Sequence, residues 1–184
     1  MNIYDAKILG LPRIEDPRGN LSIIEQLKQI PFEIKRVYWI YDVPSGMDRG
    51  AHAYKENQEF IVALSGSFDV ELDDGKSRQI FSLNRSYFGV YVPKGMWRTM
   101  KNFSTNSLAL ILSSTQYDKE DYIMDYEEFK QWTQNNMRQT MSVVNDTSIK
   151  VNNPQISFST NDGRSVFDLS LIHISEPTRL RRIS

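Results

Sequence analysis

The sequence predicts an all-β protein of the jelly-roll or sandwich type, with a short helix after the last strand. Between residues 21 and 114, short segments rich in Val, Ile, Tyr and Phe alternate with turn residues, and no helix is expected between them. Pro and Gly mark reversals at 44–46, 73–75 and 93–95. Many short strands joined by tight turns favour two packed sheets or a closed roll. The expected strands are 21–27, 34–43, 60–64, 68–72, 78–81, 88–92, 97–101 and 108–112.

The clearest strand is 68–72, in which Phe68, Val70 and Leu72 alternate with Asp69 and Glu71. Successive side chains of a strand point to opposite faces, so one face is expected to be wet and the other buried. The Asp-Gly step at 74–75 supplies a residue able to adopt positive φ. A hairpin into the strand at 78–81 is therefore expected.

The segment 118–132 predicts a helix that lies on the β structure. It is acidic and aromatic, lacks Gly and Pro, and places Tyr122, Tyr126 and Phe129 at helical spacing. From 133 to 169 the chain is rich in Asn, Ser and Thr and weakly periodic, which is typical of a loose extension or the truncated start of another domain. We therefore expect one domain over 1–132 and assign no function to 133–169.

The final residues, 170–184, resemble a translated sequencing adapter and are expected to be an artefact, so they are excluded from the reasoning about the fold. The basic residues Arg179, Arg181 and Arg182 then indicate nothing about partners. His173 is excluded for the same reason. His52 becomes the one histidine expected to be native.

Composition excludes several classes of protein. The net charge of -1 argues against a nucleic-acid surface, which needs clustered Lys and Arg. The absence of cysteine excludes disulfides and thiolate metal sites. No segment approaches the roughly 20 apolar residues of a membrane helix, and none resembles a signal peptide. We expect no membrane contact and a soluble, cytoplasmic protein.

Two motifs about thirty residues apart resemble those of the cupins, which implies a cupin jelly-roll barrel. The first runs from Gly50 through His52 to Glu59 and Gly66, and the second from Gly89 through Pro93 and Gly95 to Arg98 and Asn102. Metal-dependent cupins resemble one another in three histidines and a glutamate at these places. Here Tyr54 and Arg98 stand at two of the histidine positions, and a guanidinium beside a divalent ion is strongly unfavourable. We therefore expect no metal.

His52 has two readings from the residues alone. It could be a barrel-lining imidazole that bonds a neighbour, or an acid–base group among Arg49, Tyr54 and, across the barrel, Arg98. A pocket that combines an imidazole with fixed cations and phenols can take a proton and hold developing negative charge. Glu59 is left outside the catalytic set, as a relic of the metal motif or a salt-bridge partner.

Residues 1–132 also resemble the sugar-nucleotide 3,4-ketoisomerases, the WxcM-like group that acts on dTDP-4-keto-6-deoxyglucose. Matching motifs occur in the expected order over about two-thirds of the chain. They are Asp16-Pro-Arg18-Gly-Asn-Leu21, Arg36-Val-Tyr38-Trp-Ile40, Arg49-Gly-Ala-His52-Ala53, Ala63-Leu-Ser-Gly-Ser-Phe68, Tyr91-Val-Pro93, Trp97-Arg98, Asn102-Phe-Ser104 and Asp121-Tyr-Ile123 with Asp125-Tyr126.

The resemblance implies an isomerase that moves a ketone from C4 to C3 of a dTDP-linked 4-keto-6-deoxy hexose through an enediol. It implies a homodimer, no cofactor, and a product that feeds deoxyamino-sugar synthesis for a bacterial polysaccharide. His52 matches the catalytic histidine of the family. The expected catalytic set is His52, Tyr54 and Tyr38, and the expected substrate-binding set is Arg18, Tyr38, Arg49, Arg98 and Asn102.

Tyr54 departs from the commonest family pattern, which has a second histidine there. Its phenol titrates near pH 10 and is a weak base at neutral pH. Either His52 suffices, or Tyr54 acts as a neutral donor, or the enzyme is slow or altered in product; we favour the first two together. Structural roles stay open for Tyr54 as an aromatic wall, Arg18 as a turn brace, Tyr38 as core and Asn102 as a hairpin cap.

Three other functions are kept as alternatives. One is 3,5-epimerisation of the same kind of substrate, which resembles a His–Asp dyad with an opposing Tyr. Another is a non-catalytic cupin that binds sugar nucleotides. The last is the isomerase portion of a larger protein that also carries an acyltransferase.

Overall fold

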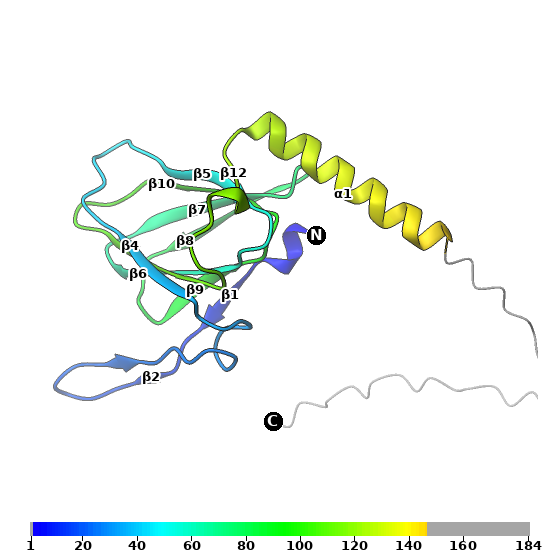
Figure 1. The fold of residues 1–184 in the computed structure, drawn as a ribbon. Helices are drawn as coiled ribbons and strands as arrows, with labels where there is room; N and C mark the ends of the chain where they lie inside the picture. The colour runs from blue at the N-terminus through cyan, green and yellow to red at the C-terminus, as the bar shows by residue number, and fades with distance from the viewer. Residues whose placement is uncertain (1, 147–184) are drawn as a thin grey trace, which may run out of the picture. The chain divides into compact units, whose positions relative to one another are not determined.

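Two five-stranded antiparallel sheets form the body of the protein (Figure 1). The computed structural model describes residues 2–146, with side chains for 2–138. One sheet has the order β1-β9-β6-β11-β4 and the other β12-β5-β10-β7-β8, while β2 and β3 form a separate pair. The strands are β1 (Lys7–Gly10), β2 (Arg13–Ile14), β3 (Leu21–Ser22), β4 (Arg36–Ile40), β5 (Arg49–Tyr54), β6 (Glu59–Ser65), β7 (Phe68–Asp73), β8 (Arg78–Leu83), β9 (Phe88–Val92), β10 (Trp97–Lys101), β11 (Leu108–Ser113) and β12 (Tyr122–Ile123).

The predicted all-β class is confirmed, and the strands expected at 88–92 and 97–101 have the bounds of β9 and β10. The predicted hairpin joins β7 and β8, and Gly75 in its turn has a φ of 87°. The strand expected at 21–27 is wrong beyond Ser22. Four strands were missed: β1, β2, β5 and β12. Among them, β5 has a weak strand signal because Gly and Ala at positions 50 and 51 have low strand propensity. Both residues have positive φ in the structure.

The main core lies between the two sheets. Ile61 on β6, Val70 on β7, Met100 on β10 and Ile111 on β11 are fully buried in one cluster. The alternation predicted for β7 is confirmed, since Phe68, Val70 and Leu72 are buried while the residues between them are partly exposed. A second cluster, with Phe60 and Val62, lies on the outer face of β6 and is covered in part by the segment around residues 30–32.

The C-terminal helix begins and ends later than expected. A 3-10 turn, η2 (Lys119–Asp121), and β12 occupy the start of the predicted 118–132 helix, and α1 runs over Tyr126–Asp146. Asp125 caps α1, accepting the backbone N–H of Glu128 at 2.8 Å. The helix continues past 132 because no Gly or Pro interrupts it before its end. The expected artefact at 170–184 and the rest of the expected extension lie outside the described residues.

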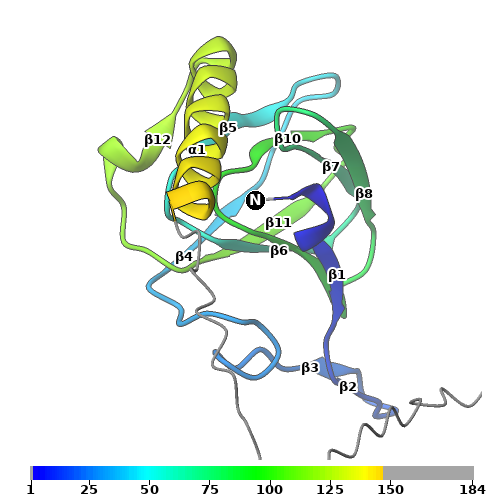
Figure 2. The same cartoon turned by 90° about the vertical axis from the view of Figure 1, so that its right-hand side faces the viewer.

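Helix α1 anchors β5 and β12 through one buried residue. Phe129 is fully buried with Ala53 and Ile123, and Trp97 packs beside them. The β2–β3 hairpin, in contrast, projects from the sheets (Figure 2). A 3-10 turn, η1 (Ile3–Asp5), precedes β1. None of the helices in the described part of the chain is long and apolar enough to cross a membrane.

Candidate active site

A pocket of about 570 Å³ opens between the sheets, beside β4 and β5. Strand β4 contributes alternate side chains to it, because Arg36, Tyr38 and Ile40 share one face of the strand. Strand β10 contributes Arg98, which pairs with His52 of β5 in the sheet register. The pocket lining comprises Arg36, Tyr38, Trp39, Ile40, Arg49, Gly50, His52, Tyr54, Arg98, Tyr117, Tyr122 and Met124.

His52 and Arg98 are neighbours on adjacent strands, which corrects the expectation that Arg98 lies across the barrel. Gly50 makes this approach possible: a Cβ at position 50 would lie 2.6 Å from Nη1 of Arg98. Its φ of 99° is also a conformation that favours glycine. Gly50 is therefore required at this position, because a side chain there would collide with Arg98.

Both ring nitrogens of His52 have protein partners. Nδ1 contacts the carbonyl oxygen of Gly50, and Nε2 lies 3.2 Å from Nη2 of Arg98. A carbonyl only accepts and a guanidinium only donates, so the contacts fix the neutral tautomer with the proton on Nδ1. Burial and then the charge of Arg98 lower the pKa of His52 to about 3, with a smaller contribution from Arg36. The imidazole is therefore neutral at pH 7, with its lone pair on Nε2.

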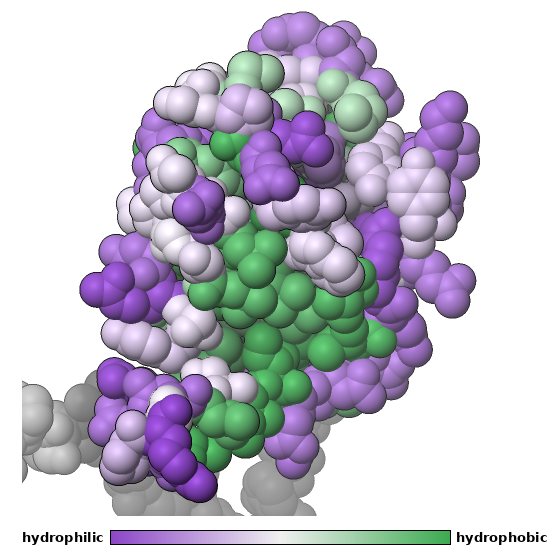
Figure 3. Space-filling view, turned by 90° about the vertical axis from the view of Figure 1, so that its left-hand side faces the viewer, coloured by the Kyte–Doolittle hydropathy of each residue, from purple (hydrophilic) through white to green (hydrophobic). Residues whose placement is uncertain are grey.

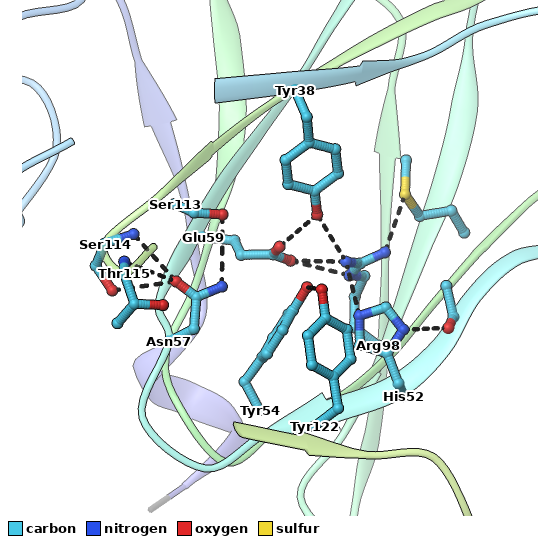
Figure 4. A network of polar contacts seen from close by, with 12 residues as sticks. Tyr38, His52, Tyr54, Asn57, Glu59, Arg98, Ser113, Ser114, Thr115 and Tyr122 are labelled. Atoms are coloured by element: carbon cyan, nitrogen blue, oxygen red, sulfur yellow. Dashed lines mark hydrogen bonds and ion pairs between the residues drawn. The ribbon is translucent and has the colours of Figure 1, made fainter. Parts of the chain in front are cut away.

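Glu59 neutralises the buried guanidinium beside His52 (Figure 4). Nη2 and Nε of Arg98 lie 2.9 and 3.0 Å from Oε2 of Glu59, and the two side chains are 2% and 1% exposed. Oε1 of Glu59 accepts the hydroxyl of Tyr38 at 2.6 Å, and that hydroxyl also accepts from Arg98 at 3.3 Å. The salt-bridge interpretation of Glu59 is confirmed. Burial raises the pKa of Tyr38, against the opposing charge of Arg98, so its phenol stays protonated.

Tyr54 and Tyr122 extend the site on the other side of His52. The hydroxyl of Tyr54 donates to that of Tyr122 at 3.1 Å, and their ring centroids lie 4.8 and 5.1 Å from that of His52. Burial, and next the charge of Glu59, raise the pKa of Tyr54. Tyr54 is thus a neutral phenol at physiological pH.

Seven residues of the lining are absent from the expected site set, and the polar ones nearest the acid–base groups are Tyr122 and Arg36. Tyr122 belongs to one of the motifs that resemble the ketoisomerases. The sequence predicts it in the helix, whereas the structure places it in an edge strand beside β5. Arg36 stands two positions before Tyr38, and this spacing on a strand places both side chains on one face. That spacing was the available signal for Arg36.

The pocket brings together five of the seven expected site residues: Tyr38, Arg49, His52, Tyr54 and Arg98. Arg49 is exposed at its rim. Arg18 lies elsewhere, on the loop of the β2–β3 hairpin, where its side chain is 91% exposed and bonds Asp16 at 2.8 Å. Asn102 also lies outside the pocket, at the end of β10, with a φ of 54° and a 2.8 Å bond to Asp69. Its side chain therefore links the end of β10 to β7.

No group of three or more His, Cys, Asp or Glu side chains within residues 2–138 is placed to hold a metal ion. The carboxylate of Glu59, which shares Arg98 as a partner with His52, is committed to Arg98 and Tyr38. The arrangement offers a neutral imidazole, phenol donors and guanidinium groups around one cavity. Such a set can move protons and stabilise an oxyanion.

A family model described as FdtA, WxcM-like, C-terminal matches residues 4–134. The chain belongs to this family. The chain is 41% identical to the TDP-4-oxo-6-deoxy-α-D-glucose-3,4-oxoisomerase of Aneurinibacillus thermoaerophilus over 128 residues. The aligned region covers 70% of this chain and 92% of that protein. The family and the isomerase class expected from the motifs are confirmed.

Solved structures agree. The TDP-quinovose 3,4-ketoisomerase WlaRB of Campylobacter jejuni is 46% identical with a TM-score of 0.67, over 70% of this chain and 99% of that one. The 3,4-ketoisomerase QdtA of Thermoanaerobacterium thermosaccharolyticum, solved in complex with TDP, is 32% identical with a TM-score of 0.71, over 73% and 98%. A mutant of QdtA was solved in complex with TDP-4-keto-6-deoxyglucose. Two sugar epimerases share only the fold, at 16% and 17% identity.

Proposed function

We propose that this chain moves the ketone of TDP-4-keto-6-deoxyglucose from C4 to C3, using its own side chains as the acid–base groups. The observation that carries the proposal is the neutral His52, whose Nε2 accepts from Arg98 at the wall of a pocket lined by phenols and guanidinium groups. The relatives' reactions and the nucleotide ligands of QdtA support the same substrate class.

The reaction balances without an external oxidant or reductant. A proton leaves C3 and one arrives on O4, which gives an enediol. A proton then arrives on C4 while one leaves O3, so that the ketone stands at C3. Two kinds of proton transfer are thus required, one between carbons and one between oxygens.

Nε2 of His52 is the proposed base for C3. This atom accepts an N–H of Arg98 at 3.2 Å, so the imidazole must exchange that hydrogen bond for the substrate's C–H. The imidazolium then formed stands beside a guanidinium, whose charge Glu59 balances. The negative enediolate balances the new charge on His52. The same nitrogen returns the proton to C4.

Tyr38 and Tyr54 are the proposed carriers of the oxygen protons. Both are neutral phenols beside His52, with hydroxyls held by Glu59 and Tyr122 respectively. A phenol can donate to O4 and accept from O3 in turn, because its hydroxyl is both donor and acceptor. Tyr54 therefore acts as a donor in place of the second histidine of the commonest family pattern. Arg49, at the rim, is the proposed contact of the diphosphate.

A homodimer is part of this proposal, with the second copy on the outer face of the β1-β9-β6-β11-β4 sheet. Figure 3 shows a broad hydrophobic area on the side where β4 lies in Figure 1. Trp39, Val37 and Leu64 are 59%, 47% and 44% exposed. Trp39 also lines the pocket, so a partner on this face would reach the pocket rim. Exposed apolar area of this kind marks an interaction surface.

Within such a dimer, the projecting hairpin offers Arg18 to the partner's pocket. This would reconcile its proposed contact with substrate with its position outside the pocket of its own chain. Mixing an Arg18→Ala dimer with a His52→Asn dimer should partly restore turnover, since one pocket of the mixed dimer carries neither change. No restoration after proven subunit exchange would contradict this arrangement. Val37→Glu with Trp39→Glu should yield monomers of 21.4 kDa in light scattering.

The reaction itself is tested in deuterium oxide with TDP-4-keto-6-deoxyglucose. The full chain should exchange the C3 proton and form the 3-keto product, both followed by NMR. Binding of TDP without exchange or product would instead support a non-catalytic binding protein. Exchange at C5 would support the epimerase alternative, for which His52 lacks a carboxylate partner among its described contacts.

A further inference from the structure

We propose that Arg36 stabilises the negative charge on the enediolate oxygens during the isomerisation. This role rests on the proposed function and adds a residue to its catalytic set. Neither the cupin motifs nor the expected site assigned any task to this residue.

Arg36 points into the pocket from β4, on the same face as Tyr38. Its guanidinium carbon lies 5.4 Å from the ring centroid of Tyr38 and 5.7 Å from that of Tyr117. The two rings hold the planar group by cation–π contacts, and the phenol of Tyr122 accepts a hydrogen bond from it. These contacts hold the guanidinium at the wall of the pocket, where its charge faces a ligand.

The three arginines of the pocket differ in how their charge is balanced. Arg98 is paired with Glu59 and makes further contacts to Tyr38, His52 and the sulfur of Met100. Arg49 is exposed to solvent. Arg36 is partly buried and forms no ion pair within the part of the chain that the structure describes.

Arg36 also has an unmet hydrogen-bond donor. Its Nε is buried and has no partner among the described residues. A buried N–H without an acceptor costs free energy, and the cost is larger for a charged group. An anionic oxygen in the pocket would supply the counter-charge that Arg36 lacks among the described residues.

The position of Arg36 favours the reacting carbons over the diphosphate. Burial opposes its charge, but the phenols of Tyr122, Tyr54 and Tyr38 outweigh burial and raise its pKa. Its charge also contributes to the lowered pKa of His52. The guanidinium carbon of Arg36 lies 5.4 Å from the ring centroid of Tyr38, one of the proposed acid–base groups, whereas Arg49 is exposed at the rim. Fixed donors at a developing oxyanion stabilise the transition state more than the ground state.

The test compares Arg36→Gln with Arg36→Lys and with Arg85→Gln, an exposed arginine away from the pocket. Arg36→Gln should lower kcat for the 3-keto product by about 10²–10³-fold. Its Kd for TDP, measured by calorimetry, should stay within about threefold, because TDP lacks the reacting sugar. Arg36→Lys should recover part of the loss by restoring the charge, and Arg85→Gln should match the parent. Thermal unfolding checks that each variant folds.

Two results would overturn the role of Arg36 and leave the proposed function intact. One is an active parent whose Arg36→Gln variant keeps its kcat. The other is a TDP affinity that falls by the same factor as kcat/KM at unchanged kcat, which would make Arg36 a diphosphate contact. A parent chain without any C3 exchange refutes the proposed function, and the enediolate role with it. If Arg36→Gln does not fold, Arg36→Lys decides: an unchanged kcat with an unchanged KM for that variant refutes the need for the guanidinium fork.

Discussion

The two ends of the space between the sheets differ in character although the same strands build them. At one end Ile61 on β6 and Met100 on β10 are fully buried among apolar side chains. Two positions earlier on each strand, Glu59 and Arg98 point the same way and form a buried ion pair. Glu59 and Ile61 lie in one regular stretch of β6, whereas the register of β10 with β5 shifts between Arg98 and Met100. A step of two residues on each strand thus separates the core from the candidate active site. The apolar end supplies burial, whereas the polar end must balance every charge that it removes from water.

The largest effect is expected from His52→Asn at the polar end. The amide keeps much of the side chain's volume but cannot accept the C3 proton, so turnover should fall by about 10²–10⁴-fold. Calorimetry should show little change in the affinity for TDP. Full turnover in this variant would remove His52 from the mechanism.

Glu59→Gln, at the polar end, should lower the free energy of unfolding more than a matched change at the apolar end. It leaves the buried Arg98 without its counter-charge, which should cost about 3–5 kcal/mol in the free energy of unfolding. The matched change two residues along, Ile61→Val, should cost about 0.5–1.5 kcal/mol. Urea denaturation measures both.

A double variant, Glu59→Leu with Arg98→Met, sharpens this prediction. Replacing both members of a buried ion pair by apolar groups should recover much of the lost stability. It should not recover turnover, because His52 loses its partner at Nε2. Equal stability of Glu59→Gln and Ile61→Val would mean that the ion pair contributes no more than packing does.

Tyr54→Phe should have a smaller effect, confined to catalysis. It keeps the ring beside His52 and removes the hydroxyl that donates to Tyr122. If Tyr54 carries an oxygen proton, kcat should fall by about 10–100-fold with little change in the free energy of unfolding. An unchanged kcat would leave Tyr54 as an aromatic wall.

The smallest expected effect is a pH dependence of stability. The folded pKa of His52, about 3, lies below its unfolded value near 6.5, so the unfolded chain binds more protons between these values. The contribution of the neutral imidazole is complete above pH 6.5 and is lost as pH falls toward 3. Between pH 7 and 5, the parent should therefore lose more stability than His52→Asn in matched thermal scans. An identical pH dependence would show that His52 titrates normally.

The sequence predicted most of the fold because strand patterns are local. The alternation in β7 and the turn chemistry around Gly75 needed no knowledge of distant residues. The site was harder, since it depends on which strands pair. The register that sets Arg98 beside His52 is fixed only when β5 joins β10, and Tyr122 enters the site only because β12 joins β5. The low strand propensity of Gly50 and Ala51 hid the strand that carries His52, and both residues have positive φ in the structure.

Gly50 governs both nitrogens of His52, though it has no side chain. Its carbonyl oxygen engages Nδ1, and the space left by its missing Cβ admits the arginine that engages Nε2. One backbone position thus dictates which nitrogen carries the proton and which carries the lone pair. Any larger residue at position 50 would disturb the protonation pattern of the imidazole, even though every polar residue of the pocket would be unchanged. Mutational scans that follow only the polar residues would overlook the position that sets the tautomer.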